Sequence, residues 1–209
     1  MLARLRGRTR NDDGGAALIE SLLIAPVLFA LLFGIFEFGL IYRDVLTSSD
    51  AAANGARRGA VIGPRIPASG VNADFEIIRE VRNGLGSMPV ESINRIVVYR
   101  ASPPGAGSPE SQVPQACKTG GSVAGVCNVY DPANAFLAVD SGNNDFFSCP
   151  GGASCAWEPT SRSNGPTPSD VDYLGVYIRV ERPYVTGLFG TEFAFERAAV
   201  VRLEAGRFE

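Results

Sequence analysis

The sequence has no histidine and only one lysine, Lys118, among its 209 residues. Without an imidazole it cannot form a serine–histidine or cysteine–histidine nucleophile pair, and a serine–lysine pair would depend on Lys118. No P-loop or G-x-G-x-x-G motif follows a predicted strand. We therefore expect a protein that is not an enzyme and holds no cofactor, although a hydrolase that uses paired carboxylates stays open.

The formal net charge of −3 offers no broad basic surface, so we expect no nucleic-acid partner. Positive charge is instead gathered ahead of a long apolar run, in Arg4, Arg6, Arg8 and Arg10. Beyond that run, Arg43 is followed directly by Asp44. Under the positive-inside rule this asymmetry predicts a cytoplasmic N-terminus and an extracytoplasmic location for residues 43–209.

Sixteen uncharged residues lie between Glu20 and Glu37, in an apolar run that extends from Gly15 to Tyr42. About 20 mostly apolar residues suffice to cross a bilayer as a helix. A cleaved secretory signal is the poorer interpretation, because no A-x-A site follows the run closely and Ala51–Ala53 comes too late. The sequence therefore predicts a single-pass protein of the cytoplasmic membrane, with the lipid bilayer as a partner.

Several features of the run go beyond a plain anchor. Pro26 removes one backbone hydrogen bond and Gly34 permits close approach of another helix, although both also suit an ordinary anchor. Acidic side chains in a membrane helix are costly and usually mark a function or a partner. Glu20 and Glu37 lie 17 residues apart, roughly 26 Å along a helix, so Glu37 fits near the outer interface. Glu20 is the better candidate for function.

After the apolar run the sequence stays compatible with a helix and becomes rich in small residues. These recur at helical spacing in Ala52, Gly55, Ala56, Gly59 and Ala60. Such a stripe permits close packing on a sheet or on neighbouring helices. Because proline cannot continue a helix, Gly63–Pro64 should end it. We expect one helix over 16–62 that serves as membrane anchor and stem; a plain single-pass tether is the alternative.

All four cysteines lie in the predicted exterior part, where an oxidising environment favours two disulfides. Of three possible connectivities we favour Cys117–Cys127 with Cys149–Cys155, because each pair closes a short glycine-rich loop. A zinc site is the weaker interpretation, since the spacings are not C-x2-C and histidine is absent. Residues 140–145 are rich in oxygen ligands but lack EF-hand spacing and a closing glutamate, so we expect a turn and no metal there.

The residues after the stem predict an α+β domain with an antiparallel sheet. Residues 71–86 have an amphipathic helical pattern with Asn72 as the N-cap, and this helix should cover the sheet. Alternating or β-branched patterns predict strands at 93–99, 174–182 and 193–204. The segment 101–170 is dominated by glycine, proline, serine and asparagine, so we expect a long loop stapled by the disulfides, with a short helix or strand at 134–139.

Three parts follow from these patterns. A basic cytoplasmic leader occupies 1–15, the transmembrane helix and stem occupy 16–62, and an exterior α+β domain occupies 63–209. The exterior domain should have one covering helix and a disulfide-stapled loop, an architecture that is pilin-like when it follows an anchor helix continued as a stem.

The string GAALIE at residues 15–20, behind an arginine-rich leader, resembles the prepilin-peptidase substrates among type IV pilin-like proteins. In that family the cut follows a glycine, and the new chain has glutamate as its fifth residue. A cut after Gly15 would make Ala16 the first residue and Glu20 the fifth. With the apolar run and the downstream AANGARRGA, residues 14–63 resemble the TadE/TadG-like pseudopilins of the tight-adherence (Tad, or Flp) pilus.

Two departures from the major Flp pilins favour a minor component. Those pilins have tyrosine after the glutamate, where this chain has Ser21, and they lack so large an exterior domain. The same departures leave open whether the leader is removed.

The resemblance implies a minor pseudopilin-like component of a Tad/Flp-type pilus assembly or secretion system that packs by its N-terminal helix. Its implied partners are other pilin-like subunits, the pilus assembly platform and, where cleavage occurs, a prepilin peptidase. It also implies incorporation in a surface pilus as one location. The alternatives are an unprocessed, membrane-anchored exterior binding or adhesion domain and an anchored hydrolase that uses exterior carboxylates.

Overall fold

A computed structural model of the chain describes residues 14–64, 70–103, 105, 107–165, 167–187 and 189–204. The leader arginines Arg4, Arg6, Arg8 and Arg10 lie outside these residues. The chain divides into two compact units, Met1–Leu40 and Ile41–Glu209. We call the second unit the head. The predicted division into leader, membrane helix with stem, and exterior domain stays a prediction.

Helix α1 (Gly14–Ile62) provides the described part of the first unit and the first element of the head. It continues through Pro26 and is followed by Gly63, whose φ of +60° suits glycine and whose N–H donates to the Gly59 carbonyl at 2.9 Å. The predicted stop at Gly63–Pro64 is therefore confirmed, and α1 already includes Gly14, the first residue that the structure describes, two residues before the predicted start near Ala16.

The head is built on a four-stranded antiparallel sheet in the order β2-β1-β3-β4. The strands are β1 (Ile93–Ala101), β2 (Cys127–Tyr130), β3 (Tyr173–Pro183) and β4 (Glu192–Arg202). The sequence predicted β1, β3 and β4. It did not predict β2, a four-residue strand inside the glycine-rich segment. The predicted α+β class is confirmed.

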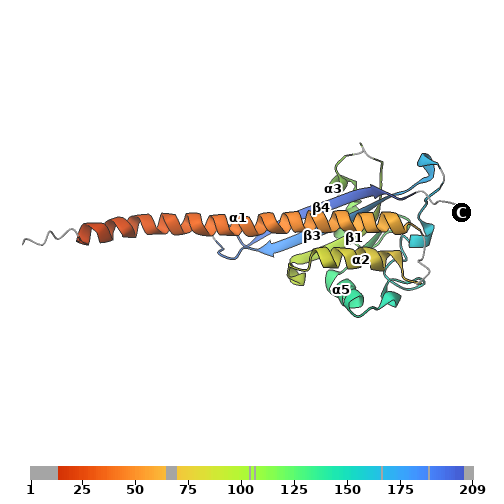
Figure 1. Ribbon diagram of the computed structural model, residues 1–209, viewed down its shortest axis with the longest axis horizontal. Helices are drawn as coiled ribbons and strands as arrows, with labels where there is room; N and C mark the ends of the chain where they lie inside the picture. The colour runs from red at the N-terminus through yellow and green to blue at the C-terminus, as the bar shows by residue number, and fades with distance from the viewer. Residues whose placement is uncertain are drawn as a thin grey trace, which may run out of the picture. The chain divides into compact units, whose positions relative to one another are not determined.

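Two helices cover one face of this sheet, side by side in Figure 1. One is α2 (Ala73–Gly84), whose N-cap Asn72 accepts a hydrogen bond from Asp74 N–H as its sequence pattern predicted. The other is the part of α1 that belongs to the head. Small residues of α1, apolar residues of α2 and the inward side chains of β1 and β3 form one buried core. A single covering helix was predicted, and the stem helix joins it.

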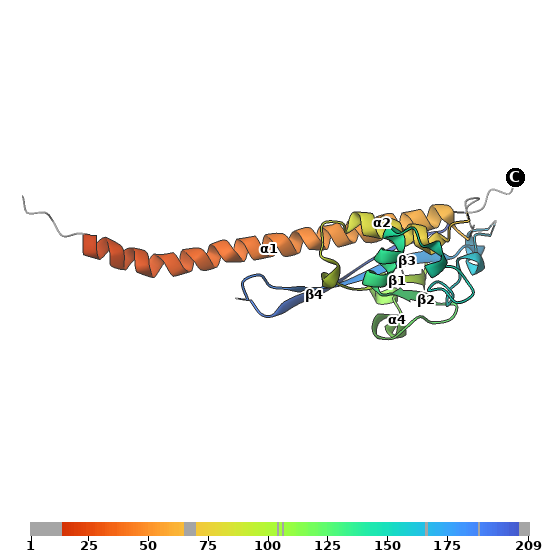
Figure 2. The same ribbon diagram turned by 90° about the horizontal axis from the view of Figure 1, so that it is seen from below.

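The opposite face carries a smaller core around Tyr99 and Tyr177, covered by two short helices, one labelled in Figure 1 and the other in Figure 2. These are α3 (Pro109–Gln112) and α4 (Gln115–Thr119). The Tyr99 hydroxyl donates to the Pro109 carbonyl at 2.8 Å, which fixes α3 over the sheet. Gly175 of β3 leaves room for the Tyr99 ring, which occupies the position that a Cβ atom would need at residue 175.

The segment 101–170 is far from structureless. Besides β2, α3 and α4 it forms α5 (Pro132–Asp140), where the sequence left a short helix or strand open. It also contains the short 3-10 helices η2 (Asn144–Phe146), η3 (Pro159–Ser161) and η4 (Pro168–Asp170); a further one, η1 (Val90–Ser92), precedes β1. The segment is stapled by Cys117–Cys127 and Cys149–Cys155, the connectivity that the short loops favoured.

Candidate functional site

The first unit presents an apolar helix surface. We call its residues 15–40 the apolar segment. Its large hydrophobic side chains are mostly exposed, among them Leu18, Leu22, Val27, Leu31, Ile35 and Phe36 at 57–75 %. Exposure of this much contiguous apolar surface marks a site of membrane or protein contact. By length and composition α1 can cross a membrane, with a mean hydropathy of 2.4 in its most apolar window.

The predicted site residues of this segment differ in their surroundings. Gly15, at the candidate cut, has open space around the position of a Cβ atom, and Ala16 and Glu20 are exposed. Pro26 is exposed too, and its missing N–H leaves the Leu22 carbonyl without the usual intrahelical donor. Glu37 is only 2 % exposed, and Gly34 is buried.

The small-residue stripe lies within the head and packs on α2 and the sheet. A Cβ atom on Gly55 would lie 2.6 Å from Val81 Cγ2, and one on Gly59 would lie 2.7 Å from Ile77 Cδ1 and 3.1 Å from Leu174 Cδ1. Ala52, Ala56 and Ala60 are at most 3 % exposed. The glycines therefore permit a close approach that any larger residue would prevent.

Ion pairs connect the stem, the part of α1 that belongs to the head, to α2 and to the sheet. Arg58 of α1 and Arg79 of α2 each place a guanidinium nitrogen 2.5 Å from Glu76 Oε2. Asp44, which is fully buried, pairs with Arg182 at the end of β3. The stem is thus tied to α2 near Arg58 and to the sheet near Asp44.

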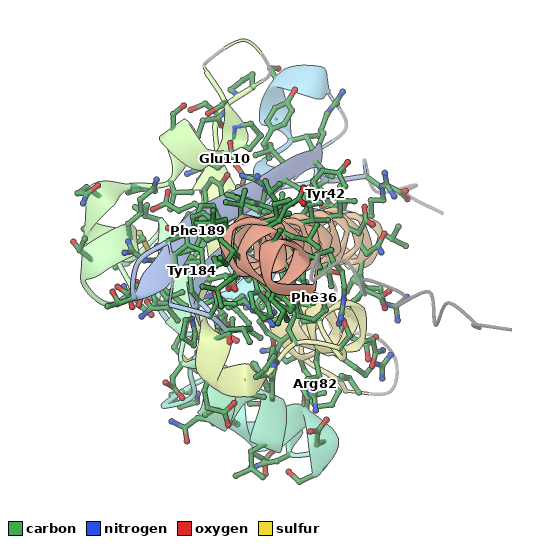
Figure 3. The ribbon with its side chains drawn as sticks, turned by 90° about the vertical axis from the view of Figure 1, so that its left-hand side faces the viewer. Phe36, Tyr42, Arg82, Glu110, Tyr184 and Phe189 are labelled. Atoms are coloured by element: carbon green, nitrogen blue, oxygen red, sulfur yellow. A yellow bond between two sulfur atoms is a disulfide. The ribbon has the colours of Figure 1, made fainter. Side chains whose placement is uncertain are left out.

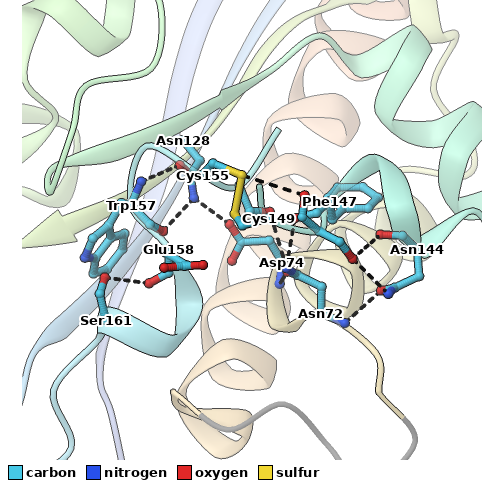
Figure 4. Close-up of a disulfide and its surroundings, with 12 residues drawn as sticks. Asn72, Asp74, Asn128, Asn144, Phe147, Cys149, Cys155, Trp157, Glu158 and Ser161 are labelled. Atoms are coloured by element: carbon cyan, nitrogen blue, oxygen red, sulfur yellow. Dashed lines mark hydrogen bonds between the residues drawn. A yellow bond between two sulfur atoms is a disulfide. The ribbon is translucent and has the colours of Figure 1, made fainter. Parts of the chain in front are cut away.

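A buried polar cluster ties the loop after α5 to the start of α2 (Figure 4). Its centre is Asp74, whose Oδ2 accepts from the Tyr130 hydroxyl at 2.6 Å and from Asn128 Nδ2 at 2.8 Å. The other carboxylate oxygen lies 2.5 Å from Arg162 NH2, and both side chains of this pair are completely buried. We call Asp74, Asn128, Tyr130, Ser154 and Arg162 the loop cluster.

The loop cluster holds its own chain segment through backbone contacts. Asn128 donates to the Trp157 carbonyl at 2.8 Å and accepts from Trp157 N–H at 2.7 Å, while the Arg162 guanidinium lies over the Trp157 ring at 4.4 Å. Burial, followed by the negative charge of Asp74, raises the pKa of Tyr130 well above its ordinary value. The cluster is a rigid support, with Tyr130 kept as a neutral donor.

The Cys149–Cys155 disulfide borders this cluster and a small hollow. Asn72 lines the hollow and contacts the cluster, because its Oδ1 accepts from Asp74 N–H at 2.8 Å. Its Nδ2 also donates to the Phe147 carbonyl at 2.9 Å, and its N–H donates to Asn144 Oδ1 at 2.7 Å. The hollow has a volume of about 120 Å³ and is lined by Asn72, Ser148, Cys149 and Glu158 among others. Of the residues 140–145, Asp140 ends α5, Ser141 and Gly142 form a turn, and Asn144 and Asp145 belong to η2. Among the described residues no group of three or more acidic or cysteine side chains is placed to hold a metal ion.

Lys118 links the loop closed by the Cys117–Cys127 disulfide to the sheet. Its ammonium lies 2.7 Å from Glu196 Oε2 on β4. Burial alone raises the pKa of the Glu196 carboxyl, but the Lys118 ammonium, the Tyr177 hydroxyl and the charge of Arg179 together bring that pKa below its ordinary value. The only lysine of the sequence therefore has a structural partner.

Sequence reasoning missed the loop cluster and the Asp44–Arg182 pair. Asp74 and Arg162 are charged residues in a helix start and in a polar loop, where solvent exposure is the usual outcome. No local pattern indicates their partners. The single tryptophan, Trp157, which lies against Arg162, was the one available signal of a buried site in that loop.

Comparison with known proteins places one part of the chain. No curated protein and no solved structure matches the chain. Residues 15–57 match the family model of TadE-like protein, which spans the apolar segment and the stem up to Arg57. The match confirms the resemblance over the residues that carry it, and it covers the N-terminal helix alone.

Proposed function

We propose that the chain is a minor, pilin-like component of a tight-adherence pilus or related secretion assembly, and that it packs against other pilin-like subunits by the apolar segment of α1. The observation that carries this proposal is the exposed apolar helix whose residues match the TadE-like family. The family points to a Tad pilus-associated component. The minor role and the packing mode are our inference from the large head and from Ser21.

In this proposal the N-terminus is cytoplasmic and the head lies outside the cytoplasmic membrane. The four leader arginines favour that orientation under the positive-inside rule. Two disulfides in the head support it, because disulfides persist in oxidising compartments and are rare in the cytosol. The bilayer, the assembly platform and neighbouring subunits are then the partners, and we propose no enzymatic activity.

Removal of the leader after Gly15 would give Glu20 a specific task. The cut would create a free amine on Ala16, four residues before Glu20. One turn of helix separates the two groups, so the amine can pair with Glu20 of the same chain or of a neighbour. In hydrocarbon such pairing offsets the cost of both charges and sets the register between adjacent helices.

Two measurements on membrane-derived protein test the proposal. Mass spectrometry of the N-terminus should find Ala16 as the first residue; a dominant terminus at Met1 or within the leader would contradict processing by a prepilin peptidase. Glu20→Ala should abolish recovery of the chain in sheared pilus or assembly fractions, with both disulfides of the head still formed. Glu20→Ala protein that assembles as the parent does would contradict the role of Glu20.

An unprocessed, membrane-anchored binding or adhesion domain is the second candidate. It is favoured by the segment 101–170, which lies outside the family match and forms β2 and the helices α3, α4 and α5. For that function Glu20 should be dispensable, and substitutions within 101–170 should abolish binding. The Glu20→Ala experiment therefore separates the two candidates.

A further inference from the structure

The turn between β3 and β4 is an apolar hairpin tip, which we define as residues 183–191. These nine residues, PYVTGLFGT, contain no charge, whereas Arg182 and Glu192 flank them. The hairpin is closed by a hydrogen bond from Tyr184 N–H to the Thr191 carbonyl at 3.2 Å. Val185 is 62 % exposed and Phe189 is 47 % exposed. The tip thus exposes the apolar side chains of Val185 and Phe189 on a turn that a backbone hydrogen bond closes.

The tip carries two aromatic side chains that lie close together. The rings of Tyr184 and Phe189 lie next to one another with centroids 6.4 Å apart, and both are labelled in Figure 3. Gly187 and Gly190 adopt φ values of +67° and +132°, which residues with side chains rarely adopt. The turn therefore requires glycine at both positions beside the aromatic pair.

The direction of β3 brings the tip to the end of the head where α1 enters it. Leu174, at the start of β3, lies against Gly59, and Arg182, near its end, pairs with Asp44. Strand β3 therefore runs antiparallel to the stem. Val185 is three residues beyond Arg182, so an extended chain carries it about 10 Å past the level of Asp44. In Figures 1 and 2 the tip extends beyond α2.

That end of the head coincides with the end of the apolar run. Tyr42 is 65 % exposed and is the last residue before the charged pair Arg43–Asp44. Aromatic side chains concentrate at the interface between hydrocarbon and water, and basic residues beside them favour anionic headgroups. Arg43 is exposed at this level, where its guanidinium donates to the Ser87 carbonyl at 3.0 Å.

We propose that the hairpin tip is a second membrane-contact element, which places Val185 and Phe189 in the interface of the bilayer that α1 crosses. Together with Tyr42 and Arg43 it would restrict rotation and tilt of the head on its anchor. This inference rests on anchoring by α1 and is independent of a role in a pilus.

The test uses the full chain in vesicles of phosphatidylcholine and phosphatidylglycerol. Val185→Cys carries an environment-sensitive fluorophore, and Val61→Cys is the matched control, because Val61 is 59 % exposed and lies about 28 Å along α1 from Tyr42. All four native cysteines are in disulfides, so the introduced thiol is the one that reacts. Peptide mapping verifies that both native disulfides persist, and flotation with the vesicles reports anchoring by α1 separately.

The fluorophore at 185 should show blue-shifted emission and strong quenching by lipids that carry a spin label near the headgroup. The fluorophore at 61 should show neither change. Equal, water-like emission at both positions in protein that floats with the vesicles would overturn the proposal. A blue shift at 185 without quenching by the lipid label would overturn it too, since the tip would then be covered by protein.

Discussion

Asp74 and Arg162 form an ion pair in which both side chains are completely buried, with Asp74 Oδ1 2.5 Å from Arg162 NH2. Asp74 lies in the first turn of α2, and Arg162 belongs to the loop that precedes β3. Because both charges are removed from water, loss of either one leaves the other uncompensated. This pair therefore couples the folding of the loop to that of the helix layer.

Arg162→Met should destabilise the head by about 3–5 kcal/mol, because it leaves the Asp74 carboxylate buried and unpaired. Chemical denaturation of the full chain in detergent, followed by tryptophan fluorescence of Trp157, measures the effect. Arg57→Met is the control, since Arg57 is exposed and hydrogen-bonds only Asn54, at 3.5 Å, in the described part of the chain. Equal stability of the two variants would contradict a structural role for the pair.

Gly55→Leu should destabilise the head by about 1–3 kcal/mol or prevent native packing, because its side chain would overlap Val81. Gly39→Leu on the same helix is the matched control, as nothing lies within 4 Å of its Cβ position. The free energy of unfolding of the head, measured for both variants, tests the expected destabilisation by Gly55→Leu. A Gly55→Leu head as stable as the control would show that the stripe does not need its small residues for contact with α2.

The two disulfides should differ in their reaction with a reductant. Cys117 and Cys127 are completely buried, whereas Cys149 and Cys155 are partly exposed. Mild reduction of native protein followed by alkylation should modify Cys149 and Cys155 first, as mass spectrometry of the peptides would reveal. Earlier modification of Cys117 would contradict the burial of that bridge between α4 and β2.

Removal of the second bridge should have a moderate cost. Replacing both Cys149 and Cys155 by alanine should lower the free energy of unfolding by roughly 2 kcal/mol, the loop-entropy expectation for a short loop. Thermal unfolding of parent and variant measures the difference. An unchanged midpoint would indicate that the loop cluster holds the segment without the disulfide.

Glu196 should make the head sensitive to acid. Since its folded pKa is below its ordinary value, its stabilising contribution is present above the unfolded pKa of about 4.3 and is lost as pH falls through the lower folded value. Glu196→Gln should cost about 1 kcal/mol or less at neutral pH, because the pair with Lys118 is partly exposed to solvent.

The difference between Glu196→Gln and the parent should shrink in acid, where the parent carboxylate is protonated as well. Denaturation curves at neutral pH and below the folded pKa provide the comparison. A difference in stability that is the same at both pH values would assign the effect to packing and not to charge.

The sequence predicted those elements whose signals are local. Strand β3 has alternating β-branched residues, and α2 has the N-cap Asn72 with an apolar face. The disulfide pairs followed from short loop lengths. In each case the residues that carry the signal are close in sequence, within one helix, one strand or one short loop.

The rest of the fold depends on partners distant in sequence. Strand β2 has four residues, too few for a periodic pattern, and exists because β1 pairs with it. The burial of Asp74 depends on Arg162, and that of Asp44 on Arg182. The small-residue stripe predicted close packing but could not specify α2 as the element that fills it. For the candidate site, the sequence alone identified the apolar segment, and the family match covers that same segment.

Crosslinking within the membrane tests the central claim most directly, that the apolar segment packs against other pilin-like helices. A photoreactive amino acid at position 35, where Ile35 is 73 % exposed beside Gly34, would be activated in cells that produce the full chain. We predict crosslinks from position 35 to other pilin-like subunits, which are lost with Glu20→Ala. Crosslinks to lipid alone, with no protein partner, would contradict an assembly role and leave the helix as a simple anchor.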